Sequence, residues 1–244
     1  MIIDKETCIG CELCTHYCPV GAIKMMEWEG EPKAEIDPDE CVECDACRLR
    51  ARVCPVDAIH MPELEWPRVI RAYFSNPHVQ HPSTGEQGRG TGEMKTNDVT
   101  GRYPRGIAGV VLEMGRPGIG TSIRDLQTAT MILAKMGVEF EPDNPVAAIM
   151  ADMTTGKIKD DVLNEKVLSA MIEFKIENER LRDAFEAIKA VSKAIDTVFS
   201  LDLVSRVSPD GTIPTAPVAE AAGFCPRPNA KINVGLGKPR VKED

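Results

Sequence analysis

Eight of the nine cysteines fall within the first 54 residues, in two runs of nearly the same sequence. The stretch "IDKETCIGCELC" from Ile3 is repeated as "IDPDECVECDAC" from Ile36. The first run is spaced C-x2-C-x2-C-x3-C-P and the second C-x2-C-x2-C-x6-C-P. The cysteines are Cys8, Cys11, Cys14 and Cys18 in the first run, and Cys41, Cys44, Cys47 and Cys54 in the second.

Three cysteines with two residues between each pair allow a tight loop to wrap around one corner of a metal–sulfur cube. The backbone N–H groups of such a loop turn toward the sulfides. Structural zinc is the alternative, but a zinc site closes with four ligands and needs no third cysteine at this spacing. The seven residues before Cys8 are too short and too acidic for a secretory signal, so we expect a cytoplasmic chain whose thiols stay reduced. The pattern therefore favours iron–sulfur clusters.

Residues 1 to about 62 resemble a bacterial-type ferredoxin with two [4Fe-4S] clusters, over about a quarter of the chain. The resemblance implies two half-domains related by an approximate twofold axis, each lending its fourth cysteine to the other. Cluster 1 is then held by Cys8, Cys11, Cys14 and Cys54, and cluster 2 by Cys41, Cys44, Cys47 and Cys18. Matching apolar residues are expected to pack between the clusters: Ile3 with Ile36, Ile9 with Val42, Val20 with Val56, and Ile23 with Ile59.

The second run departs from the simple pattern, because six residues, "RLRARV", separate its last two cysteines. Arg48, Arg50 and Arg52 alternate there, and positive charge beside a cluster would raise its reduction potential. The alternative, which we favour, is a solvated loop whose arginines balance Asp45 and Asp57. His16 is expected to play a surface role, because eight thiols fill the ligand positions without it.

Charge and hydropathy exclude other classes of partner. The net charge is −9, and the first 61 residues hold thirteen Asp and Glu against six Lys and Arg. Nucleic acid is therefore not expected as the main partner, because a phosphate-binding surface needs clustered Lys and Arg. No run of eighteen apolar residues exists, so no membrane insertion is expected.

Residues 63–106 are rich in Pro, Gly, Ser and Thr and show little periodicity. They predict a long extended segment without a fold of its own, either an arm that lies on a partner protein or a flexible tether.

Residues 107–244 predict an α+β sandwich that docks onto a partner. Strands are expected in "GIAGVVLEM" from Gly106, "VEFEP", "TVFSLDLVSRV" and "AKINVGLG". A helix is expected from the N-cap Thr121 or Ser122 to a stop at Gly137, and a second over residues 160–195.

This second part contains no catalytic motif that we recognise. Its best candidate for an anion site is "GRPGIGTSIRD", from Gly115 to Asp125 with Arg116 and Arg124. We favour the alternative, an ordinary strand-to-helix turn, because turn chemistry alone explains the segment. The lone Cys225 is expected to be buried and inert.

Two functions remain. The first is an iron–sulfur electron-transfer subunit whose flavin- or metal-containing active site lies on a larger oxidoreductase chain. The second is a self-contained enzyme or redox sensor with its site in residues 107–244. The missing cofactor motif and the predicted arm favour the first.

Overall fold

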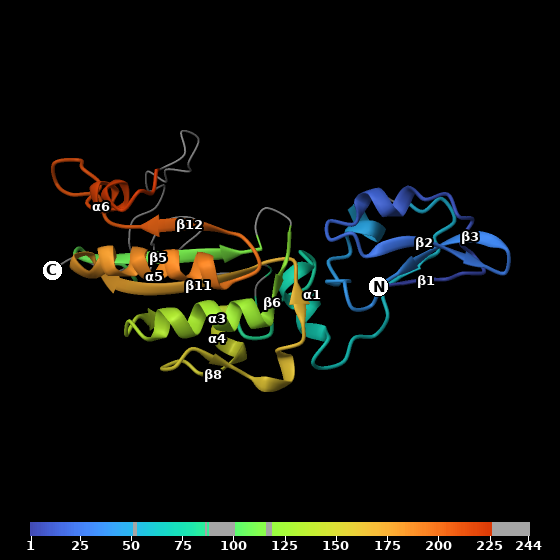
Figure 1. Ribbon diagram of the computed structural model, residues 1–244, viewed down its shortest axis with the longest axis horizontal. Helices are drawn as coiled ribbons and strands as arrows, with labels where there is room; N and C mark the ends of the chain where they lie inside the picture. The colour runs from blue at the N-terminus through green and yellow to red at the C-terminus, as the bar shows by residue number, and fades with distance from the viewer. Residues whose placement is uncertain (51–52, 86, 88–100, 116–118, 226–244) are drawn as a thin grey trace.

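The computed structural model describes residues 1–50, 53–85, 87, 101–115 and 119–225. The molecule is elongated, with the cysteine-rich module at one end and a four-stranded sheet at the other, as Figure 1 shows. Helix α1 (Val69–Ser75) lies between the two parts. Helices and strands are mixed, so the expected α+β class is confirmed at this level.

The N-terminal module repeats one plan twice: a strand, a cysteine loop, a short helix and a second strand. The elements are β1 (Ile2–Ile3), η1 (Leu13–Tyr17) and β2 (Ile23–Trp28), then β3 (Glu31–Ile36), η2 (Ala46–Arg50) and β4 (Ile59–His60). The strands pair across the halves, with Ile3 opposite Ile59 in β1–β4 and Ile23 opposite Ile36 in β2–β3. The duplication aligns Ile3 with Ile36 and Ile59 with Ile23, so it converts one pairing into the other. The module therefore has approximate twofold symmetry.

The apolar residues that the duplication aligns mostly enter one core. Ile23, Ile36 and Ile59 are buried with several of the cysteines. The other aligned residues Ile3, Val20 and Val56 are half-buried and pack against this core. Ile9 is the exception, so the prediction that it packs between the clusters is wrong. Its side chain is 60% exposed, whereas its counterpart Val42 is 3% exposed.

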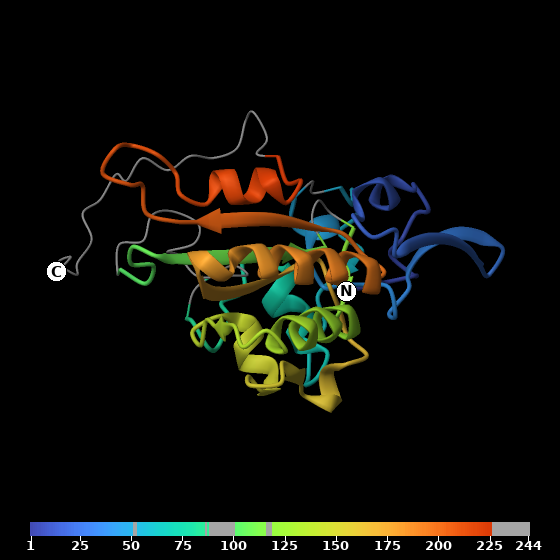
Figure 2. The same ribbon diagram turned by 60° about the vertical axis from the view of Figure 1, so that its left-hand side comes forward.

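The sheet that follows has the strand order β12-β5-β11-β7, and every neighbouring pair is antiparallel. Along the chain the order is β5 (Ile107–Met114), α3 (Ile123–Ala134), β7 (Glu139–Phe140), β11 (Ala170–Glu177), α5 (Leu181–Ala194) and β12 (Phe199–Val204). This is a β-α-β-β-α-β arrangement. Helices α3 and α5 lie side by side on one face of the sheet, as both views show (Figure 1, Figure 2).

Shorter elements decorate this framework. They are β6 (Thr121–Ser122), α4 (Pro145–Ile149), β8 (Met150–Asp152), β9 (Lys157–Ile158), η3 (Asp160–Val162), β10 (Lys166–Val167), η4 (Asn178–Arg180) and α6 (Ala216–Ala221). The pairs β8–β9 and β6–β10 are both antiparallel. The β6–β10 pair lies at the end of the sheet that faces α1 and the N-terminal module (Figure 1). None of the described helices combines the length and apolar character needed to cross a membrane.

Most of the elements predicted between residues 106 and 204 are present. Strands β5, β7 and β12 are confirmed, and α3 begins after Ser122, whose hydroxyl accepts a hydrogen bond from the Asp125 N–H. The long helix predicted from residue 160 is wrong before Leu181, because residues 170–177 form the central strand β11. Ile172, Phe174 and Ile176 enter the main core at every second position, which is the period of a strand, and Met171 and Glu173 are buried on the other face. The strand predicted in residues 230–237 lies outside the described residues.

The expectation of an extended arm over residues 63–106 is also wrong in part. Ile70 and Phe74, one helical turn apart in α1, are buried in the core of the sheet. The helix was missed because it has only seven residues between Pro67 and Pro77, too few to show a helical period.

We predict that Gly156→Ala destabilises the protein by about 3 kcal/mol or more. Gly156 has φ +72°, and a Cβ there would lie 2.4 Å from the backbone oxygen of Thr130. Gly137 is the matched control, because it has φ +69° with open space around it. Gly137→Ala should cost only about 1 kcal/mol from backbone strain. Urea unfolding followed by circular dichroism measures both, and equal losses would contradict the predicted clash.

Candidate iron–sulfur centres

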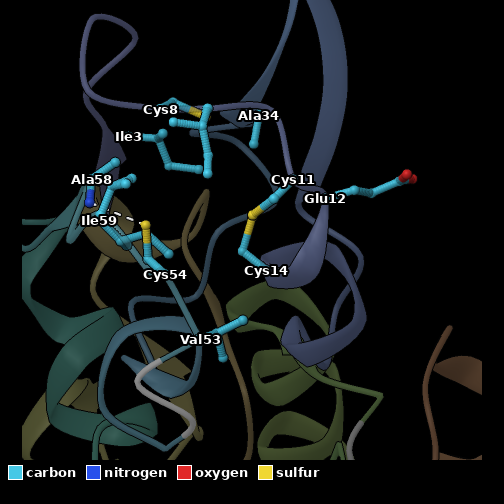
Figure 3. A pocket seen from close by; sticks show the side chains of 12 residues that line it. Ile3, Cys8, Cys11, Glu12, Cys14, Ala34, Val53, Cys54, Ala58 and Ile59 are labelled. Atoms are coloured by element: carbon cyan, nitrogen blue, oxygen red, sulfur yellow. Dashed lines mark hydrogen bonds between the residues drawn. The ribbon is translucent and has the colours of Figure 1, made fainter.

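The eight thiols of the two runs line two separate cavities. One cavity is lined by Cys8, Cys11, Cys14 and Cys54, with an empty space of about 320 Å³ that is partly open to solvent (Figure 3). The other is lined by Cys41, Cys44, Cys47 and Cys18, with about 300 Å³. Cys54 thus lies with the first run although it is forty residues away from Cys14 in the chain. This grouping matches the two ligand sets that the resemblance implied, while ligation itself stays a prediction.

The loops close around these cavities through left-handed backbone conformations at equivalent positions. Gly10, Glu12 and Gly21 in the first half correspond to Glu43, Asp45 and Asp57 in the second, and all six have φ between 53° and 68°. Such conformations cost about 1–3 kcal/mol at a residue other than glycine. The second half accepts this strain at three positions, and two of the carboxylates concerned, those of Glu43 and Asp45, are bound by arginines.

The fourth cysteine of each run is oriented by a backbone hydrogen bond to its sulfur. The Ala22 N–H donates to the Sγ of Cys18 at 3.1 Å, and the Ala58 N–H donates to the Sγ of Cys54 at 3.1 Å (Figure 3). Hydrogen bonds of this type stabilise a thiolate ligand. Four thiols, apolar walls and N–H groups directed at sulfur together fit a [4Fe-4S] cluster in each cavity. Within the described ranges, no three potential ligands converge on a site for a single metal ion.

Burial makes these thiols hard to ionise without a metal. The pKa values of Cys14, Cys41 and Cys44 are raised, chiefly because burial disfavours the charged thiolate. Burial and then the neighbouring Cys44 and Cys41 raise the pKa of Cys47 to about 12. Because the cysteines bind iron as thiolates, loading must release protons from thiols that are otherwise neutral at pH 7.

The two cavities differ in how far the rest of the chain covers them. Cys11 is exposed beside cavity 1, whereas its counterpart Cys44 is half-buried beside cavity 2. The loop beside cavity 2 is covered by α1, by Arg68 at the start of that helix, and by β10. The Arg68 guanidinium donates to the buried Glu43 carboxylate at 2.6 and 3.0 Å, and Lys166 forms an ion pair with Glu40 at 2.6 Å.

Arg71 makes the deepest of these contacts and is 5% exposed. Its Nη1 donates to the carbonyl oxygens of Pro38, Asp39 and Cys41 at 3.0, 3.4 and 2.7 Å. Its Nε donates to the Glu165 carboxylate, next to β10. Cavity 2 is lined by residues of the module, and Arg71 ties the cysteine loop beside it to the sheet-bearing part.

The arginine-rich insertion is partly explained. Arg48 donates from Nε and Nη2 to the two carboxylate oxygens of Asp45 at 2.9 and 2.7 Å. Asp45 in turn raises the pKa of Arg48. This agrees with the interpretation that the arginines balance nearby carboxylates, at least for Arg48. The side chain of Arg50, and Arg52 altogether, lie outside the described residues.

Sequence reasoning missed four residues of the site: Glu43, Arg68, Arg71 and Lys33, whose Nζ donates to the Cys8 carbonyl oxygen at 2.7 Å. Aligning the two runs could have identified Glu43, because it occupies the position of Gly10 and a glutamate there is unfavourable without a specific role. The two arginines carried no signal, since they lie in a segment that was expected to be extended.

Two minor candidates resolve differently. At the candidate anion site, the Ile119 and Gly120 N–H groups donate to the Gly115 carbonyl, and Arg124 donates to Asn164. Arg116 lies outside the described residues. Cys225 is exposed, so the prediction of a buried thiol is wrong.

Comparison with known families agrees with the geometry of the module. Residues 1–61 match the family described as a 4Fe-4S dicluster domain. The N-terminal quarter is therefore similar to a two-cluster ferredoxin-like module, and the match supports iron–sulfur cluster binding. No curated protein and no solved structure is similar enough to the chain to count as a match.

We predict that the protein prepared without oxygen holds about eight iron atoms and eight inorganic sulfides per chain. Two cavities with four thiols each provide for two [4Fe-4S] clusters. Iron and acid-labile sulfide analysis of the full-length chain measures this. Four or fewer iron atoms, or zinc in their place, would contradict it.

Crossed ligation gives a separate prediction. Cys18→Ala should damage cluster 2, because the Cys18 thiol lies in the cavity of the second run. Cys54→Ala is the matched variant and should damage cluster 1. Electron paramagnetic resonance of the reduced protein distinguishes the two clusters. Loss of cluster 1 in the Cys18 variant would show that each run binds its own cluster.

Proposed function

We propose that this chain is the electron-transfer subunit of a larger cytoplasmic oxidoreductase, with two [4Fe-4S] clusters that relay electrons to or from a redox centre on a partner chain. The observation that supports this best is the pair of thiol-lined cavities within a module that matches a dicluster family. Bound clusters supply one-electron transfer. The chain's own residues hold them, limit water access and set how each one faces its surroundings.

Cluster 1 is the one positioned to meet a partner. Cys11 is exposed, and the loop and helix that carry it present Ile9, Leu13 and Tyr17, which are 60%, 47% and 49% exposed. Apolar side chains gathered beside a redox centre suit docking, because electron transfer requires close approach and small acidic proteins otherwise form weak, salt-sensitive encounters. We therefore place the exchange of electrons with the partner at this face.

The sheet-bearing part serves as an extension for docking in this proposal. It is fixed to the module through buried charges, so it moves with cluster 2 and does not swing on a tether. A second anchored surface would turn a transient encounter into a permanent subunit, since stable interfaces bury at least about 1,200 Å² in total. The partner that we expect is a larger catalytic chain with a flavin or metal centre.

Anaerobic purification of the tagged full-length chain from its own cells tests this proposal. We expect a larger chain to co-purify, and its reduced centre to reduce the two clusters in stopped-flow spectroscopy. A chain that is isolated alone and turns over a substrate by itself would contradict the proposal and favour the self-contained enzyme.

Leu13→Gln and Tyr17→Gln should each slow electron exchange with that partner by about tenfold, the effect of losing one interface anchor. Neither side chain lines a cavity, so iron content and reduction by a small chemical reductant should not change. Ile2→Gln is the matched control, because Ile2 is 52% exposed on strand β1 and lines neither cavity. Equal slowing in the control would contradict the assigned face.

A further inference from the structure

The first cysteine of each run has the same unusual contact on its backbone. The carbonyl oxygen of Cys8 accepts a hydrogen bond from Lys33 Nζ at 2.7 Å. The carbonyl oxygen of Cys41, its counterpart in the duplication, accepts one from Arg71 Nη1 at 2.7 Å. Each cavity therefore has one cation at an equivalent point of its cysteine loop.

Both cations are buried, Lys33 inside the acidic module and Arg71 against it. Lys33 is 7% exposed and Arg71 is 5% exposed. Taking a charged side chain out of water is costly unless it gains compensating partners. A positive charge in such a place acts strongly on a nearby cluster, because little solvent screens it.

The cations differ in origin and in pairing. Lys33 belongs to β3 inside the module, and its carboxylate partner Glu31, at 2.9 Å, is 70% exposed on its side chain. Arg71 belongs to α1, outside the residues that match the dicluster family, and its partner Glu165 is 11% exposed on its side chain. The charge of Lys33 is thus paired in solvent, whereas that of Arg71 is paired inside the protein.

We propose that Lys33 and Arg71 are positioning residues, one for each cluster, which hold the first ligand of each loop and raise the reduction potential of that cluster. Glu165 offsets the charge of Arg71, so residues outside the ferredoxin module set the potential of cluster 2 without altering cluster 1. This inference rests on the proposed function, because it requires both clusters to be bound. Its physical basis is that positive charge stabilises the reduced cluster, which carries one more negative charge.

Neutralising either member of the buried pair Arg71 and Glu165 should shift the reduction potential of cluster 2, but in opposite directions. Arg71→Gln removes the cation and should shift the potential of cluster 2 to a more negative value. Glu165→Gln leaves the cation without its counter-charge and should shift the same potential to a more positive value. A purely structural role would give shifts of the same sign, because either substitution loosens the same contact.

Lys33→Gln is the corresponding variant for the other cavity. It should lower the potential of cluster 1 and leave cluster 2 unchanged. Lys166→Gln is the matched control, because Lys166 is a cation of the same interface whose side chain is 40% exposed. Its shift should be smaller and should vanish in 1 M salt, where the screening length is about 3 Å. The shifts at the two buried sites should persist.

The experiment is a potentiometric titration of the full-length, anaerobically prepared protein, followed by electron paramagnetic resonance. A Cys11→Ser variant identifies the signal of cluster 1. Opposite shifts for Arg71→Gln and Glu165→Gln, confined to cluster 2, support the inference. Shifts of the same sign, shifts of both clusters together, or no shift in protein with a full iron content overturn it.

Loss of cluster 2 from the Arg71→Gln variant would not end the test. Arg71→Lys keeps the charge and should restore cluster 2 at a potential near that of the wild type, and Glu165→Gln must still raise that potential. Failure of either result overturns the inference. Iron-free wild-type protein would instead defeat the proposed function, and the inference with it. Normal cluster loading with unshifted potentials would defeat the inference alone.

Discussion

Each cysteine cavity needs a thiol from the other half of the duplicated module, and most of the N-terminal fold follows from this exchange. Cys54 faces the first run and Cys18 faces the second, while β1 pairs with β4 and β2 pairs with β3. Strand pairing and thiol grouping are therefore two results of one arrangement. Neither half can complete a cavity alone, so the module should form cooperatively, with iron binding and folding coupled.

Buried charges on α1 then connect the module to the sheet-bearing part. Arg68 and Arg71 are three residues apart, so they lie on the same side of α1 and both point toward the second cysteine loop. Ile70 and Phe74, four residues apart, lie on a neighbouring face of the helix and enter the core of the sheet. One short helix thus joins an apolar core to the second cysteine loop, and it makes the surroundings of the two cavities different although the sequence makes their cysteines alike.

The cysteine module could be predicted from sequence because its spacing encodes the geometry of the site directly. The first sheet strand and the helix after it were also predictable, since Ser122 supplies a standard N-cap and the apolar periods are clear. Strand β11 was missed because its core residues merge with the helical stripe that begins at Leu181. Helix α1 and its arginines were missed because their role depends on contacts with residues about thirty and ninety positions away, which no local pattern records.

The left-handed residues of the two loops also bear on the history of the duplication. At residue 10 only glycine fits, because a Cβ would lie 2.1 Å from the Pro32 carbonyl oxygen. At the equivalent place in the second half stands Glu43, fully buried, whose carboxylate binds Arg68 and the N-terminal amine. Copying the second loop over the first would create a steric clash, and the reverse copy would remove the buried carboxylate that pairs with Arg68. The two repeats have therefore ceased to be interchangeable, and recombination between them can no longer make them identical without damage to the protein.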